Sequence, residues 1–370
     1  MNYKSVKSAD KLITLLNTHD IIERYAFLDL DFPVDEKSFR NTQFIDCLFL
    51  GCRLHDYFPD NFKNCLIFPS LNVPYNVFTN ELYNYKTLFG EYRPGHPETY
   101  DSTFDQQVYK RFVQKGIIPE DIGETLARSL HDHSISDSLN EFLSHWDTRK
   151  VVGIMGGHGI KRNDKLFREV AEISKTLTEK GYLMVSGGGP GAMEATHLGA
   201  WLAGKTDQCL TEAISILSQA PAYTDTHWLD KALEVIKKYP DSQYQSLGIP
   251  TWHYGHEPTT PFASHIAKYF ANSIREDGIL TIAQGGIIFT PGSAGTLQEI
   301  FQEAAQNHYL TFGISSPMAF YNKQYWTEEY PVYTLLETLQ EKGKYKNLIL
   351  SLNDTIDETI NEILKFTGHN

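Results

Sequence analysis

The stretch Tyr182–Ala195 reads YLMVSGGGPGAMEA and decides the fold. Its apolar run predicts a buried strand over Tyr182–Ser186, and the glycines that follow predict a tight loop over Gly187–Gly191. A helix is expected over Ala192–Gly204. This order of strand, glycine turn and helix is typical of the repeating unit of a parallel α/β sheet.

Two more apolar runs end in glycine turns that lead into helices. The first is KVVGIMGG over 150–157, and the second is the strand Gly286–Thr290 with the loop Pro291–Gly295 and the helix Thr296–His308. In open parallel sheets such loops gather at the carboxyl edge of the strands. Because glycine has no Cβ, backbone N–H groups there can surround an anion at the positive end of the next helix. The three loops therefore predict a phosphate-binding edge.

The rest of the second part alternates in the same way. Helices are expected over 163–180, 208–219, 226–238, 265–276, 326–341 and 355–366, and strands over 317–320 and 347–352. We therefore predict an α/β fold, a Rossmann-like doubly wound parallel sheet, over residues 149–370. None of the loops matches GxxxxGK[ST], which disfavours an NTP-hydrolysing motor. A clean GxGxxG with an acidic partner is also missing, which argues against an ordinary NAD enzyme.

Residues 1–148 form a predicted N-terminal accessory domain, rich in aromatic residues, β-rich first and helical over 104–146, with a break at 132–137. Phe39, Phe44, Phe49 and Leu54 recur every five residues, and Cys47 and Cys52 stand two places before the last two. This spacing resembles the pentapeptide repeat, in which large and small residues stack inside a square β-coil. An irregular β-rich segment explains the pattern equally well.

Composition restricts the partners. The 370 residues include 33 Lys and Arg against 46 Asp and Glu, a net charge of 33 − 46 = −13. Such an acidic chain is a poor candidate for binding long nucleic acid or an anionic membrane, whereas helix-end donors act locally and can still hold a small nucleotide. We expect no transmembrane helix and no signal peptide. The four cysteines form no CxxC pair, so we expect buried, reduced thiols and a cytoplasmic location.

The glycine loops also carry a family resemblance. Residues 186–195, SGGGPGAMEA, resemble the first signature of the LOG ("lonely guy") phosphoribohydrolases, GGGxxGLMG, and residues 291–299, PGSAGTLQE, resemble the second, PGGxGTxxE. The resemblance covers roughly residues 149–352. The extra N-terminal part is closer to the larger bacterial nucleoside-monophosphate nucleosidases of this family, many of which carry the label "lysine decarboxylase". That label is rejected because no lysine stands in a context suited to pyridoxal phosphate. No cofactor is expected.

The resemblance implies an enzyme, usually a homodimer or larger homo-oligomer, that hydrolyses a nucleoside 5′-monophosphate to free base and ribose 5-phosphate. It implies catalytic roles for Arg275, which stands in NSIRE where the family has MHxRK, and for Glu299. We expect Arg275 to pair with Glu299. Predicted substrate contacts are Gly156, Gly157, Gly187, Gly188, Gly189, Gly191, Met193, Gly292, Ser293, Ala294, Gly295 and Thr296.

Two histidine-containing segments could suggest a metal. Trp252–Pro258 holds two His and one Glu, but the ligands are too close in one turn-rich segment, so we expect a loop that covers the substrate. His131–His133 is expected to be a helix entrance, capped by Ser134 or Asp132. Two other interpretations stay open: a non-catalytic protein that senses a nucleotide through the same loops, and a regulatory or oligomerisation role for residues 1–148.

Overall fold

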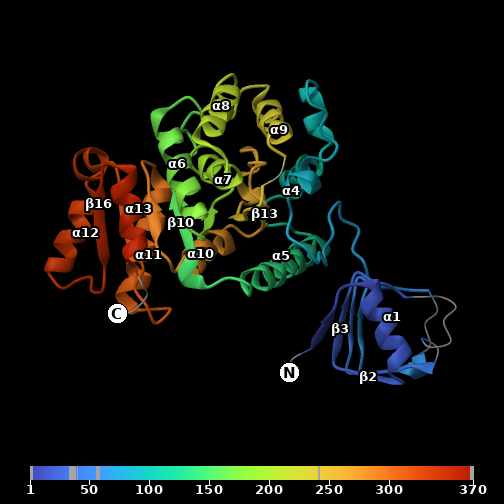
Figure 1. Cartoon of the computed structure of the whole chain (residues 1–370). Coiled ribbons are helices and arrows are strands. Elements are labelled where there is room, and N and C mark those ends of the chain that lie inside the picture. The colour runs from blue at the N-terminus through green and yellow to red at the C-terminus, as the bar shows by residue number, and fades with distance from the viewer. Residues whose placement is uncertain (1–2, 33–38, 40, 56–58, 241, 367–370) are drawn as a thin grey trace. The chain divides into compact units, whose positions relative to one another are not determined.

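The computed structural model describes residues 3–32, 39, 41–55, 59–240 and 242–366. The chain divides into two compact units (Figure 1). The first contains Met1–Leu82 and Val113–Ser138, and the second contains Tyr83–Phe112 and Leu139–Asn370. This division differs from the single boundary predicted near residue 148, because residues 83–112 pack with the second unit. The accessory role of residues 1–148 stays a prediction.

The first unit contains a coil of short parallel strands. Its strands are β1 (Lys4–Val6), β2 (Ile21–Glu23), β3 (Tyr25–Leu28), β4 (Asp31–Phe32), β5 (Gln43–Ile45), β6 (Leu48–Leu50), β7 (Arg53–Leu54), β8 (Phe62–Lys63) and β9 (Leu66–Phe68). They form three ladders, ordered β1-β3-β6-β9, β2-β5-β8 and β4-β7, and every described pair is parallel. Register partners such as Lys4 and Tyr25 or Ala26 and Leu48 are about one coil apart.

The corners of the coil explain the five-residue period. Arg24, Asp29, Asp46, Gly51 and Asn64 each separate two consecutive strands, and each has a positive φ between 49° and 68°. Asp, Asn and Gly tolerate this left-handed conformation better than most residues. At four of these corners the backbone N–H donates to a carbonyl one coil further along the chain.

The interior of the coil holds stacked rings and thiols. Phe27 lies 5.0 Å from Phe49 and Phe44 lies 5.2 Å from Phe62, measured between ring centroids with the rings nearly parallel. The Cys47 thiol donates to the carbonyl of Ile22 in the previous coil. The large and small residues therefore stack as in a pentapeptide-type coil, which decides between the two interpretations of the N-terminal pattern. Of the four cysteines, only Cys47 is fully buried.

The first unit also contains one whole α-helix and most of a second one. Helix α1 (Ala9–Thr18) contributes Leu12, Leu15 and Leu16 to the aromatic core. Helix α5 (Ile122–Leu143) is continuous. The break predicted at 132–137 and the helix entrance predicted at His131 are therefore wrong, because these residues lie in the interior of α5.

The second unit is built on a seven-stranded parallel sheet. Its strands are β10 (Val151–Met155), β11 (Leu183–Ser186), β12 (Ser246–Gly248), β13 (His265–Ile266), β14 (Ile287–Phe289), β15 (Pro317–Tyr321) and β16 (Ile349–Asn353). The spatial order is β13-β12-β11-β10-β14-β15-β16. The chain thus runs outward from β10 in one direction, returns to β14 beside β10, and continues in the other direction. This is the topology of the predicted Rossmann-like doubly wound sheet.

Helices cover both faces of this sheet (Figure 1). The described α-helices that lie wholly or mostly in the second unit are α3 (Tyr85–Phe89), α4 (Phe104–Lys115), α6 (Lys165–Glu179), α7 (Ala192–Trp201), α8 (Asp207–Leu217), α9 (Trp228–Lys238), α10 (Asn272–Ile282), α11 (Ala294–Tyr309), α12 (Val332–Glu341) and α13 (Ile356–Lys365). Alternate residues such as Ile154 and Ile288 belong to the core cluster with α6, α7 and α13. On the opposite face, Phe320 contacts Tyr333 of α12 and Trp326 of the π-helical turn η5 (Tyr325–Glu329).

Two short elements depart from the prediction. The helix expected over 265–276 begins only at Asn272, and His265–Ile266 is the edge strand β13, paired with Leu247–Gly248 of β12. The sequence analysis also missed β12, whose three residues are too few for a periodic pattern. Among the described residues, no helix has both the length and the apolarity needed to cross a bilayer.

Candidate active site

The three glycine loops meet at the point where the strand order reverses. Strands β10 and β14 are neighbours, with Met155 in register with Phe289, so the loops that follow them leave the sheet side by side. The N–H of Gly157 donates to the carbonyl of Pro291 at 3.0 Å, and the N–H of Ala192 donates to the carbonyl of Gly157 at 3.1 Å. The first loop is therefore fastened to the other two, as the sequence predicts for one carboxyl edge.

Several of these glycines serve the packing between the loops. A Cβ on Gly156 would lie 2.0 Å from Oγ1 of Thr290, and one on Gly292 would lie 2.2 Å from Oγ1 of Thr296. Gly191 has a φ of +70°, and its Cβ would collide with the carbonyl oxygen of Gly157. Gly188 has a φ of +75° beside Pro250. Glycine is thus required at these positions by the close contacts between loops, whatever ligand they hold.

A cavity of about 340 Å³ opens at this edge, within the usual range for small-molecule sites. It is lined by Gly156, Gly157, His158, Met193, Tyr254, Glu257, Arg275, Ser293, Ala294, Gly295, Thr296, Gln298 and Glu299. The predicted catalytic residues Arg275 and Glu299 therefore line the same space, from α10 and α11. Whether they pair directly, as the sequence analysis expects, stays a prediction.

The floor of this cavity includes the N-terminus of α11. Ser293 is the N-cap residue, and its side chain makes no capping hydrogen bond. The N–H groups of the first helical turn point out of a helix without intrahelical acceptors, and the helix dipole makes this end positive. A Cβ on Gly295 would meet nothing within 4 Å, so the turn is open at this residue. Phosphate oxygens fit this environment.

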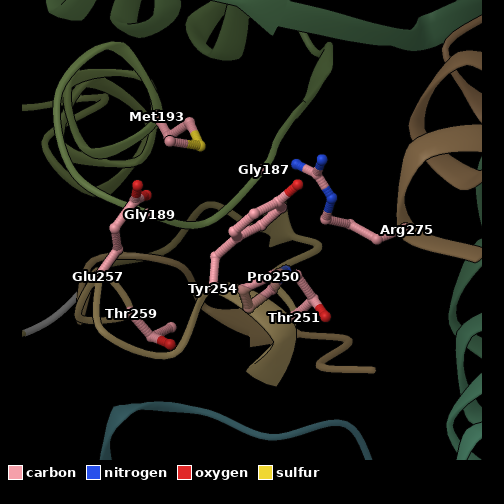
Figure 2. Close-up of a pocket in the computed structure, with 9 residues that line it drawn as sticks. All are labelled: Gly187, Gly189, Met193, Pro250, Thr251, Tyr254, Glu257, Thr259 and Arg275. Atoms are coloured by element: carbon pink, nitrogen blue, oxygen red, sulfur yellow. The ribbon is translucent and has the colours of Figure 1, made fainter. Parts of the chain in front are cut away.

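A smaller cavity adjoins the first. It is lined by Gly187, Gly189, Met193, Pro250, Thr251, Tyr254, Glu257, Thr259 and Arg275 (Figure 2). Met193, Tyr254, Glu257 and Arg275 line both spaces, so the two form one site with two compartments. Among the predicted contacts, Gly188, Gly191 and Gly292 line neither compartment.

Tyr254 is a site residue that the sequence analysis did not identify. It ends the short 3₁₀ helix η4 (Trp252–Tyr254), and its ring centroid lies 5.8 Å from the guanidinium carbon of Arg275. The two side chains point toward one another in Figure 2. A guanidinium at this distance from a tyrosine ring is stabilised by the cation–π interaction. The pair gives the wall of the site a flat, positively charged surface.

Glu257 is a second carboxylate that motif reasoning missed. Its Oε1 lies 3.6 Å from Nδ1 of His158 and 3.9 Å from Nε2 of His256, and its side chain is 17% exposed. A Cβ on Gly189 would lie 3.6 Å from its Oε2. The sequence analysis placed this segment over the substrate but assigned none of its residues. The sequence feature that could have indicated Glu257 is an acidic residue close to two histidines in a turn-rich loop.

A buried hydrogen-bond network contacts the segment Trp252–Pro258. Nζ of Lys268 donates to Oδ1 of Asp105 at 2.5 Å and to Oγ1 of Thr259 at 2.8 Å, while Nε1 of Trp252 donates to the same Asp105 oxygen at 3.0 Å. Lys268 and Asp105 are 1% and 2% exposed. Burial lowers the pKa of Lys268, and Asp105 opposes this shift. Tyr109, one turn after Asp105 in α4, packs against Gly255.

Glu194 of the first signature lies outside the site. It forms a bidentate ion pair with Arg162, and neither side chain is more than 1% exposed. The structure makes Glu194 the internal partner of a buried arginine.

No three His, Cys, Asp or Glu side chains within the described ranges are grouped so that they could hold a metal ion.

Comparisons with known proteins return solved structures alone; no family model and no curated protein matches the chain. A molybdenum cofactor binding protein from Rippkaea orientalis is 14% identical, with 58% of this chain and 94% of that chain covered and a TM-score of 0.37. A structural-genomics target is 18% identical, with 58% and 99% covered and the same TM-score. The molybdenum cofactor carrier protein of Chlamydomonas reinhardtii is 12% identical, with 58% and 96% covered and a TM-score of 0.35. Likeness at this level does not extend to ligand or activity.

Proposed function

We propose that the chain hydrolyses the N-glycosidic bond of a nucleoside 5′-monophosphate and releases the free base and ribose 5-phosphate. One observation carries the proposal. Arg275, Glu299 and the N-terminus of α11 line a single cavity at the switch point of the sheet. That cavity offers an anion site, a cation and a carboxylate, which are the groups that this reaction needs.

The 5′-phosphate occupies the first turn of α11. Ser293, Ala294 and Gly295 present backbone N–H groups, and Thr296 adds a hydroxyl. Because these donors act within a turn, they hold a small anion despite the net charge of −13. The base and sugar extend from there toward Met193 and Tyr254, which line both compartments.

The carboxylates in the cavity stabilise the charge that develops as the glycosidic bond breaks. As the base departs, positive charge develops on the ribose, and a carboxylate beside the sugar stabilises it, as in glycoside hydrolysis. We assign this role to Glu299, which also orients the ribose hydroxyls or the attacking water. The water oxygen bonds to C1′ and loses a proton, the bonding pair of the C1′–N bond leaves with the base nitrogen, and the base takes up a proton, so the base leaves neutral. Glu257 is a second carboxylate in the cavity, placed beside His158.

The test is a base-release assay. The full chain is incubated with AMP, GMP, CMP, UMP and IMP, and free base and ribose 5-phosphate are measured. We expect release from at least one nucleotide. Arg275→Ala and Glu299→Gln should each reduce kcat by about a hundredfold or more, the size of effect that charge-stabilising groups have in other enzymes. Glu257→Gln tests the second carboxylate in the same assay.

Controls separate the outcomes. Glu341→Gln, at the exposed end of α12, is the matched surface change and should leave the rate unaltered. Thermal unfolding of each variant checks that it folds. If no nucleotide releases its base but AMP still binds, the chain is the nucleotide-binding protein of the alternative interpretation. If release persists unchanged in both Arg275→Ala and Glu299→Gln, the site assignment fails and the reaction stands.

Assembly and location belong to the same proposal. From the resemblance we propose a homodimer or larger homo-oligomer in the cytoplasm. Light scattering coupled to size-exclusion chromatography measures the mass directly. A monomer at micromolar concentration would contradict the proposed assembly.

A further inference from the structure

A third cavity, of about 280 Å³, lies in the second unit and shares no lining residue with the two compartments of the candidate site. Its ten lining residues include Tyr92, Tyr100, Tyr223, Trp228, Asp225 and His256. Four of the ten side chains are tyrosine or tryptophan. So high a share of flat rings around one space is characteristic of sites for flat ligands.

Three of the four rings are held in place by contacts within the protein. Oη of Tyr92 donates to Oδ1 of Asp230 at 2.8 Å. Trp228 is 2% exposed, and the guanidinium carbon of Arg162 lies 4.3 Å from its ring centroid. Tyr92 and Tyr100 meet edge to face at 6.4 Å. A ligand that stacks here therefore loses little free energy to ordering the walls of the cavity.

The charges of the lining select against anions. No Lys or Arg is among the ten described residues that line this cavity, and Asp225 is its one carboxylate. Oδ2 of Asp225 accepts from the N–H of Ala222 at 2.8 Å. The carboxylate keeps further acceptor capacity. A ligand with a ring N–H or amino group suits this environment, and a phosphate does not.

We propose that this cavity binds a planar nitrogen heterocycle without a phosphate, of the size and chemistry of a free nucleobase. The rings of Tyr223 and its aromatic neighbours stack on the heterocycle, and Asp225 accepts a hydrogen bond from its N–H. This binding stands independently of the proposed hydrolase activity.

The cavity borders the candidate site at two places. His256 and Pro258 line it and flank Glu257 in the sequence. The ring of Tyr223 meets the ring of His158 edge to face at 6.1 Å, and His158 lines the larger compartment. A bound heterocycle therefore contacts the segment that carries Glu257, and the ring of Tyr223 lies between it and His158.

The test is calorimetric titration of the full chain with adenine, with ribose 5-phosphate as the phosphate-bearing probe. We expect saturable adenine binding that Tyr223→Ala weakens about tenfold, since one base–aromatic stack contributes about that much. Tyr223→Phe keeps the ring and should keep the affinity. Arg275→Ala should leave adenine binding intact. Tyr309→Ala, an exposed tyrosine of α11 at 77% exposure, is the matched control.

Two results would overturn the proposal. One is no heat and no saturation with adenine up to about 1 mM, a concentration at which even weak ligands register. The other is adenine binding that Arg275→Ala abolishes and Tyr223→Ala spares, which places the base in the candidate site. Neither result depends on turnover. Failure of base release in the nucleotide assay would leave the adenine titration unaffected, so the two proposals fail separately.

Discussion

Arg162 and Glu194 form a two-point ion pair inside the second unit. Nε of Arg162 donates to Oε2 of Glu194 at 2.9 Å, and Nη2 donates to Oε1 at 2.5 Å. Nη1 donates to the carbonyls of Ala220 and Trp228. The arginine therefore joins the loop after β10, helix α7, and the stretch from Ala220 to the first residue of α9.

Removal of Arg162 should destabilise the protein strongly. Arg162→Met leaves the Glu194 carboxylate buried without its cation, and breaking such pairs costs about 3–5 kcal/mol. Urea unfolding measures the change in free energy. Arg149→Met is the matched control, because its pair with Asp147 is about half exposed and contributes at most about 1 kcal/mol. Equal losses in the two variants would contradict the buried role of Arg162.

Glu303 should make the fold less stable as the pH rises through the weakly acidic range. Burial raises the pKa of Glu303 from 4.5 to about 7, and Ser316 donates a hydrogen bond to it. The unfolded chain loses this proton near pH 4.5 while the folded chain holds it to about pH 7, so stability falls between these values by about 3 kcal/mol. Glu303→Gln should remove this loss. The test is to measure the unfolding free energy of both proteins at about pH 4.5 and pH 8. If the difference in unfolding free energy between wild type and Glu303→Gln does not grow with pH, the proposed effect of Glu303 is wrong.

His197 should act in the opposite direction. Complete burial lowers the pKa of His197 from 6.5 to about 3, and its Nδ1 lies 3.1 Å from Oγ of Ser246. Below pH 6.5, His197 takes up a proton in the unfolded chain but stays neutral in the folded chain. Stability therefore falls on acidification by about 1.4 kcal/mol per pH unit until about pH 3. In His197→Gln this contribution should vanish. Denaturant melts from about pH 7 down to pH 4 measure the slope, and equal acid slopes in both proteins would exclude the role of His197.

Alanine substitutions at Gly292 and Gly295 should distinguish the role of this loop in packing from its role in ligand binding. Gly292→Ala places a Cβ 2.2 Å from Oγ1 of Thr296 and 3.0 Å from the Gly157 nitrogen, so it should lower the melting temperature. Gly295→Ala meets nothing within 4 Å and should fold normally. Its methyl group should hinder an anion at the first turn of α11 and weaken AMP binding about tenfold. Calorimetric titration and thermal unfolding of both variants test the contrast, which fails if Gly295→Ala binds AMP as tightly as wild type.

The Rossmann-like sheet can be predicted from the sequence because most of its strands and turns are each encoded in one short stretch of residues. An apolar run that ends in glycine, as at Tyr182–Gly191, contains both the strand and the turn that follows. Strands β12 and β13 carry no such signal. They have three and two residues and owe their conformation to the neighbouring strand, so His265 could be mistaken for the start of a helix.

The residues of the candidate site differ in the same way: some can be found from a local motif and others cannot. Arg275 and Glu299 follow from a motif, whereas Tyr254 and Glu257 belong to a loop whose contacts are set by the fold. Asp105 shows the limit most clearly. It lies 163 residues before its partner Lys268, and no periodicity or spacing indicates that the two meet.

Loss of the Asp105 carboxylate should disturb the loop that carries Tyr254. Asp105→Asn leaves the Lys268 ammonium buried without its counter-charge and should cost about 3–5 kcal/mol. A double variant, Asp105→Leu with Lys268→Met, removes both charges and should recover most of that stability. It also removes the acceptor of Trp252 Nε1. Faster amide hydrogen exchange over 252–258 should therefore persist in the double variant, even where global stability returns. Exchange in this loop that simply follows global stability would show that Asp105 stabilises the unit without positioning the loop.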